Sequence, residues 1–227
     1  MFFNQSGGIG DIIFLEPVSR FFYTLGHSVY WKVYDVFYED LVRHIPYVNW
    51  VVDCDSIPPT KTLDFEHARF QGMRILESKY NLVGLPLESW RSLSYLRDFT
   101  RERTLFEELN LKPHDRYCLR QLRYGSKSDV NSGTHGVEIQ DSQEMRTIDL
   151  NPIDGFSLFD WSGVIQNSSE IKVVSTSSLF LIETLHLVNN PTLDLYARET
   201  DPSISETSYL CKKGWKFHRI GDTKWET

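Results

Sequence analysis

Apolar side chains near the start of the chain change from a strand pattern to a helix pattern and back. Apolar residues at helical spacing fill 12–25, and Gly26 is a natural stop for a helix. The flanking stretches 2–5 and 27–37 are rich in β-branched and aromatic residues, which is typical of strands. Pro17 indicates that part of the apolar run precedes the helix or kinks it.

The alternation continues with a short helix that ends near Pro46 and a strand over 49–55. Strands that alternate with helices favour a parallel sheet with helices on its faces. Residues 56–84 carry a weaker pattern, in which a loop precedes a strand and a helix. The charged and apolar stretch 87–111 is predicted to be helical, in one or two pieces.

A second unit of the same kind follows the predicted linker Lys112–Asp115. It begins with a strand in 116–125, and the polar, Gly- and Ser-rich stretch 126–147 is predicted to be mostly loop. The remaining pattern is an amphipathic helix, a strand that ends in four hydroxyl residues, a buried helix and two further strands: 156–168, 169–178, 179–190, 191–197 and 215–221. We therefore predict an α/β protein of two domains, 1–112 and 113–227.

Length and charge are compatible with this interpretation. A chain of 227 residues can form one large domain or two of about 110 residues each. The net charge of −7 leaves no general basic surface for nucleic-acid phosphates, which disfavours a nucleic-acid partner without excluding one. No apolar run is long enough for a membrane span, and no secretory signal pattern precedes the first strand.

The three cysteines are Cys54, Cys118 and Cys211, far apart and without a C-x-x-C pair. This spacing predicts neither a disulfide framework nor a zinc ribbon, and free thiols suit a reducing cytoplasm. We expect a cytoplasmic protein.

Two stretches, 2–14 and 171–185, share one design: a strand, a loop of small residues and an apolar helix. The amino terminus of a helix offers unpaired N–H groups and a partial positive charge. Small residues let an anion come close, so each junction can hold a phosphate or another substrate group. Ligands of parallel sheets bind at the carboxyl ends of the strands, so one junction in each half suggests a ligand that bridges two units.

The first junction carries half of a dinucleotide-binding fingerprint. Gly8-x-Gly10 matches its first two glycines, but Ile13 stands where the third belongs, and Asp35 could hold a ribose hydroxyl. A nicotinamide cofactor is therefore one alternative, and a tight turn without a ligand is another.

Two longer stretches, 7–33 and 155–196, resemble the two signatures of the heptosyltransferase-like glycosyltransferases. The first has a small-Gly-Asp turn, an apolar helix, Gly-His and a strand. The second has a helix, a strand, a hydroxyl-bearing turn, a helix, a proline and a strand. The resemblance implies the GT-B architecture, in which two Rossmann-like domains with parallel sheets face each other across a cleft, here in a trimmed form because the chain is shorter than typical relatives.

The resemblance also implies roles for residues. Asp11 stands at the position of the family's general base, which takes a proton from the acceptor hydroxyl. Gly8 and Gly10 leave room for a sugar beside it. A helix-capping role is the alternative for Asp11.

The second turn, Ser175, Thr176, Ser177 and Ser178, stands where the family binds its nucleotide-diphosphate sugar, and an N-cap cluster is the alternative. Relatives often have Asp-Thr-Gly and then a histidine here, whereas Leu179 follows in this chain.

The implied activity is inverting, metal-independent transfer of a sugar to a glycan or other hydroxyl acceptor, with no cofactor. The altered second turn motivates an alternative, a catalytically inactive nucleotide-binding protein of the same fold. A nicotinamide-dependent oxidoreductase is the third hypothesis.

Basic residues after the first strand of the second half are candidates for the diphosphate, or else belong to a solvated loop: Arg120, Arg123 and Lys127. Acidic residues that could hold ribose hydroxyls follow them: Glu138, Asp141 and Asp149. A further group, Asp64, Glu66 and His67, could ligate a metal or form the polar edge of a strand.

Overall fold

The computed structural model describes residues 1–5, 8–52, 61–112, 114–121, 123–124, 135–136, 139, 142, 144–197 and 209–219. The chain forms two compact units, Met1–Leu96 and Arg97–Thr227, and each has a parallel sheet. The sequence pattern placed the division at 112/113. Helix α4 (Phe99–Glu108) falls in the second unit because it packs against the segment 159–167.

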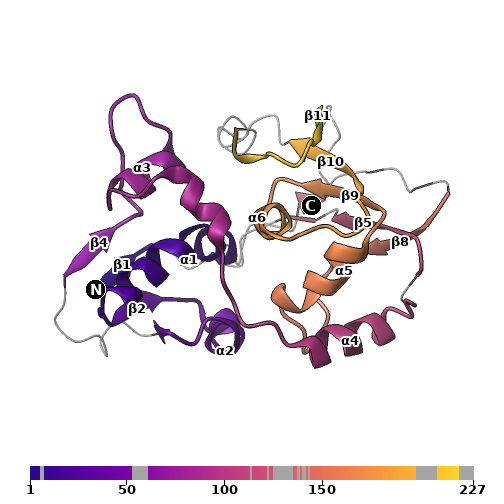
Figure 1. The fold of residues 1–227 in the computed structure, drawn as a ribbon, viewed down its shortest axis with the longest axis horizontal. Helices are drawn as coiled ribbons and strands as arrows, with labels where there is room; N and C mark the ends of the chain where they lie inside the picture. Colours follow the sequence, from indigo (N-terminus) through magenta and orange to yellow (C-terminus); the bar gives the residue numbers. More distant parts are fainter. Residues whose placement is uncertain are drawn as a thin grey trace. The chain divides into compact units, whose positions relative to one another are not determined.

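The sheet of unit 1 has four parallel strands in the order β3-β2-β1-β4 (Figure 1). Their bounds are β1 Phe2–Asn4, β2 Val29–Lys32, β3 Val48–Val51 and β4 Thr62–Asp64. The chain builds outward from β1 to β3 and then crosses to the other side of β1. The strand order therefore reverses between β1 and β4, which is where doubly wound sheets bind ligands. The predicted parallel sheet is confirmed.

The helices of unit 1 are α1 Ile9–Thr24, α2 Asp35–His44, α3 Ile75–Asn81 and the 3-10 helix η2 Leu87–Ser92. The expectation that Pro17 delays or kinks the first helix is wrong about its start, because α1 begins at Ile9 and runs through the proline. Every side chain from Ile12 to Ser19 is buried, so packing outweighs the backbone hydrogen bond that proline cannot make. The predicted stop at Gly26 is confirmed by its φ of 84°.

Aromatic rings fill the core of unit 1. Phe3 on β1 contacts Trp31 and Phe65, at ring-centroid distances of 5.2 and 4.9 Å. Phe14 on α1 contacts Tyr80 on α3, whose hydroxyl donates to the Phe14 carbonyl at 2.7 Å. This contact fixes α3 against α1, which matters because both helices contribute to the site described below.

The sheet of unit 2 has five parallel strands in the order β11-β10-β9-β5-β8 (Figure 1). Their bounds are β5 Tyr117–Gln121, β8 Arg146–Asp149, β9 Glu170–Val174, β10 Thr192–Ala197 and β11 Lys216–Arg219. A separate antiparallel pair joins β6 Arg123–Tyr124 to β7 His135–Gly136. The strand order reverses between β5 and β9, so this sheet has its switch point there.

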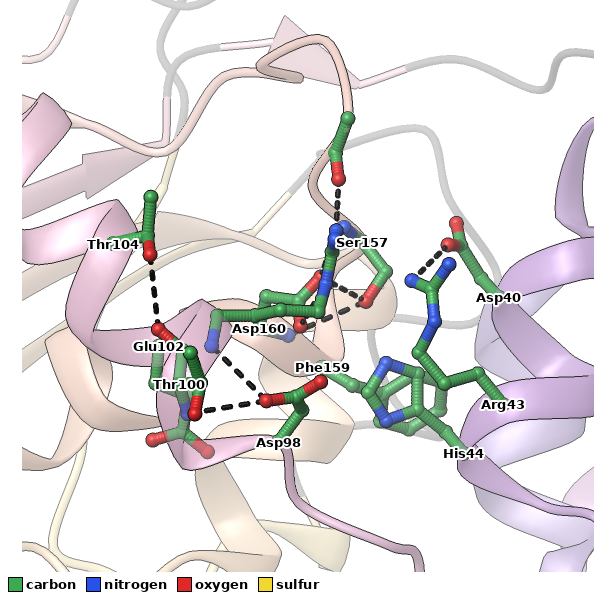
Figure 2. A network of polar contacts seen from close by, with 12 residues as sticks. Asp40, Arg43, His44, Asp98, Thr100, Glu102, Thr104, Ser157, Phe159 and Asp160 are labelled. Atoms are coloured by element: carbon green, nitrogen blue, oxygen red, sulfur yellow. Dashed lines mark hydrogen bonds and ion pairs between the residues drawn. The ribbon is translucent and has the colours of Figure 1, made fainter.

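The helices of unit 2 are α4, the 3-10 helix η3 Phe159–Trp161, α5 Ser162–Asn167 and α6 Ser177–Thr184. The predicted amphipathic helix over 156–168 is thus a 3-10 turn followed by a short α-helix. Asp98 caps α4 by accepting hydrogen bonds from the N–H groups of Thr100 and Arg101 (Figure 2). Within the described ranges, no helix combines the length and apolar character that a membrane crossing requires.

Gly163 allows α5 to pack closely on α4. A Cβ added there would lie 2.8 Å from Oε2 of Glu102 and 3.2 Å from the ring of Phe106. Glu102 cannot easily move away, because Arg97 binds its carboxylate through two nitrogens. We expect Gly163→Ala to lower the free energy of unfolding by about 1–3 kcal/mol through overpacking.

Urea unfolding followed by tryptophan fluorescence measures this loss. The control, Glu108→Ala, changes an exposed residue of α4 and is expected to stay within about 0.5 kcal/mol of the parent protein. Equal stability of the two variants would contradict close packing at Gly163.

Candidate functional site

Asp11 lies at the carboxyl edge of the unit 1 sheet, in the first turn of α1. The helix follows β1 after a short connection and has Gly8 at its N-cap position, in an extended conformation. Gly8 has no side chain that could cap the helix, and Asp11 is the third helical residue, so Asp11 is not itself the N-cap residue. A carboxylate in the first turn is favoured by the helix dipole.

Lys79 on α3 fixes the carboxylate of Asp11. Its ammonium donates to Oδ1 at 2.8 Å, and the exposed fractions are 6% for the lysine side chain and 33% for that of Asp11. The second oxygen, Oδ2, lies over Gly8, where an added Cβ would be 3.5 Å away. Lys79 thus binds Oδ1 of the part-exposed carboxylate, while Oδ2 lies at the glycine turn. Gly10 lies beside it as the second residue of α1.

The hydroxyl-bearing turn of unit 2 lies at the corresponding edge of the second sheet, between β9 and α6. Ser175 and Ser178 are buried, whereas Thr176 and Ser177 are partly exposed. Gln121, the last residue of β5, accepts hydrogen bonds at Oε1 from Thr176 (2.7 Å) and from Ser178. These bonds tie β5 to the turn across the switch point.

Because the hydroxyl groups of Thr176 and Ser178 point to Gln121, they do not cap α6. Thr176 is the N-cap residue by position, but its side chain makes no capping hydrogen bond. The hydroxyl of Thr176 therefore does not serve as an N-cap. The N–H groups at the start of α6 carry the partial positive charge of the helix and suit an anion.

Arg120 on β5 forms an ion pair with a residue of the neighbouring strand in the sheet of unit 2. Its guanidinium contacts both oxygens of Asp149 on β8, at 2.7 and 3.2 Å, and donates to the carbonyl of Ile139 at 3.2 Å. Neighbouring residues of a strand point to opposite faces, so Arg120 and Gln121 lie on different faces of β5. The structure thus brings Arg120 together with Asp149, itself a candidate for ribose binding, and not with the hydroxyl turn.

Several other predicted residues lie outside the described part of the chain. The backbone of Arg123 belongs to β6 but its side chain is not described, and Lys127, Glu138 and Asp141 lie outside the described residues.

Comparison of this chain with protein-family models, curated proteins and solved structures found no match.

Ile13 argues against a nicotinamide cofactor at the first junction. This residue is fully buried in α1, where the dinucleotide fingerprint has a glycine that lets helix and strand pack closely. Asp35, the candidate for the ribose, is the first residue of α2.

Lys79 and Gln121 are the two site residues that sequence reasoning missed. Lys79 follows Asp11 by 68 positions and Gln121 precedes Ser178 by 57. A polar residue at the very end of a central strand is the signal that could have identified Gln121. Nothing in the pattern around Lys79 indicates that its ammonium turns inward.

Proposed function

We propose that this chain is a glycosyltransferase that moves a sugar from a nucleotide-diphosphate sugar to an acceptor hydroxyl, with inversion and without a metal ion. One observation carries the proposal. Each of two parallel α/β units has a strand-to-helix junction of small residues at its sheet's carboxyl edge, and the first carries the part-exposed carboxylate of Asp11. The resemblance to heptosyltransferase-like enzymes adds the GT-B arrangement, with the two junctions facing one cleft.

In this proposal Asp11 is the general base. Oδ2 accepts the proton of the acceptor hydroxyl, while Lys79 holds Oδ1 and so fixes the direction of the carboxylate. The hydroxyl oxygen forms a bond to the anomeric carbon of the sugar from the face opposite the leaving group. The bond from that carbon to the phosphate oxygen breaks, and its electron pair leaves with the nucleotide diphosphate.

The turn before α6 stabilises the leaving group. Negative charge grows on the diphosphate as the glycosidic bond breaks, and the N–H groups of the first helical turn donate to it. The partly exposed hydroxyl of Ser177 can add a further donor. Gln121 holds Thr176 and Ser178 in place, so that the turn needs little rearrangement when the donor binds.

The test measures release of nucleoside diphosphate from a panel of nucleotide-diphosphate sugars, with and without acceptor sugars. Release that depends on an acceptor, together with a glycosylated product of inverted configuration, supports the proposal. No turnover with any donor in the presence of acceptors would contradict it.

A second candidate, a nucleotide-binding protein without catalysis, is favoured by one observation. Thr176 and Ser178 donate to Gln121, so their protons are not directed toward a bound phosphate. Thermal stabilisation by nucleoside diphosphates without any turnover would select this candidate, and stabilisation by a nicotinamide dinucleotide would select the oxidoreductase.

A further inference from the structure

Asp64 and His67 lie at the switch point of the unit 1 sheet. Asp64 is the last residue of β4, and its register partner is Asn4, the last residue of β1. The side-chain amide of Asn4 donates to Oδ1 of Asp64 at 3.0 Å, across the point where the strand order reverses. The polar group of 64–67 therefore occupies the place where a parallel sheet binds its ligand, at the edge from which α1 and Asp11 follow.

The carboxylate of Asp64 orients the ring of His67. Nδ1 lies 3.0 Å from Oδ2 and 3.1 Å from Oδ1, and the backbone N–H of His67 also donates to Oδ1 at 3.3 Å. A carboxylate can only accept, so Nδ1 carries the proton, and Nε2 of the neutral ring holds a lone pair. Within the part of the chain that the structure describes, Nε2 accepts no hydrogen bond, and the side chain is 75% exposed.

Asp64 stays ionised beside the ring. Desolvation alone would raise the pKa of Asp64, but the hydrogen bonds from His67 and Asn4 outweigh it and hold this pKa below its usual value. Two more charged residues share this loop, Glu66 and Arg69, and Nη1 of Arg69 donates to the carbonyls of Glu66 and Ala68.

We propose that His67, oriented by Asp64, is a second proton-transfer residue of unit 1, and that it receives at Nε2 the proton that leaves the acceptor hydroxyl. This inference rests on the proposed function and extends it. Asp11 takes the proton as the bond to the anomeric carbon forms, and the nucleotide diphosphate departs with the electron pair of the broken bond. The proton then passes to Nε2 of His67 and from the exposed ring to solvent, which returns Asp11 to its ionised form.

The first test compares His67→Gln with the wild-type protein in steady-state transfer. We expect kcat of the variant to fall about a hundredfold, the lower end of what a positioned proton-transfer group contributes. The control is His27→Gln, because His27 is also exposed but precedes β2 at the opposite, amino edge of the same sheet.

The second test is independent of turnover. Nitrogen NMR of the histidine rings should show neutral His67 protonated at Nδ1, and Asp64→Asn should weaken that preference. A ring protonated at Nε2 would overturn the inference even if transfer occurs. A rate of His67→Gln equal to that of the wild type would also overturn it and leave the proposed function standing. Absence of sugar transfer by the wild-type protein would overturn both the inference about His67 and the proposed function.

Discussion

Replacing Asp11 with asparagine is expected to lower kcat for sugar transfer by about a hundred- to ten-thousand-fold, the usual contribution of a general base. Asparagine has nearly the shape of aspartate, and its amide oxygen can still accept the hydrogen bond from Lys79. The fold and the affinity for nucleoside diphosphates should therefore remain. Steady-state rates and calorimetric binding of the diphosphate, measured on the same preparation, separate the two effects.

The matched control for Asp11→Asn is Glu39→Gln, which neutralises an exposed carboxylate on α2. We expect it to transfer sugar at the wild-type rate. Full activity of Asp11→Asn would remove Asp11 from the mechanism, whereas loss of both activity and diphosphate binding would indicate that the substitution disturbs the structure.

We expect Asp160→Asn in unit 2 to lower the free energy of unfolding by about 3 kcal/mol. This is the largest effect on stability that we expect from a single substitution. The side chain of Asp160 is fully buried, and Arg101 contacts its two oxygens at 3.1 Å each. Ser157 donates to Oδ2 from its backbone N–H and its hydroxyl, at 2.7 and 2.9 Å (Figure 2). An amide lacks the charge that Arg101 needs and cannot accept all of these bonds.

The loss of stability in Asp160→Asn should depend on pH. Burial raises the pKa of Asp160, but the bonds from Arg101 and Ser157 outweigh it and hold the pKa below its usual value. The ionised group therefore contributes its full stability above the ordinary aspartate pKa of about 4, and that stability is lost as pH falls through the lowered value.

Urea unfolding at pH 7 and pH 3 tests this dependence. The difference between the wild type and Asp160→Asn should be large at neutral pH and smaller in acid. Asp154→Asn changes an exposed residue nearby and should stay within about 0.5 kcal/mol at both pH values. A difference that grows in acid would contradict the account of this pair.

Much of the fold follows from the spacing of apolar residues. The helix over 12–25 and its stop at Gly26 were predictable because a long run of apolar residues at helical spacing and a glycine at positive φ are local features. The parallel sheets were predictable because strands alternate with helices along both halves. Strand β8 was not, because Arg146–Asp149 has only Ile148 buried and forms through its pairing with β5.

The candidate site was predictable only in part. Gly8, Asp11 and the hydroxyl turn stand out locally, since each lies where a strand leads into a helix. Their partners do not, because Lys79 and Gln121 come from elements distant in sequence. Arg120 is a candidate for the diphosphate from its place in the first strand of the second half, but its ion pair with a register partner on β8, Asp149, could not be predicted locally.

The proposed nucleotide site is best examined in a crystal structure with a bound nucleoside diphosphate. We expect the two phosphates at the amino terminus of α6, within hydrogen-bond distance of its first N–H groups and near Ser177, with the carboxylate of Asp11 facing the same space. Phosphates bound away from α6, or Asp11 directed away from the nucleotide, would contradict it.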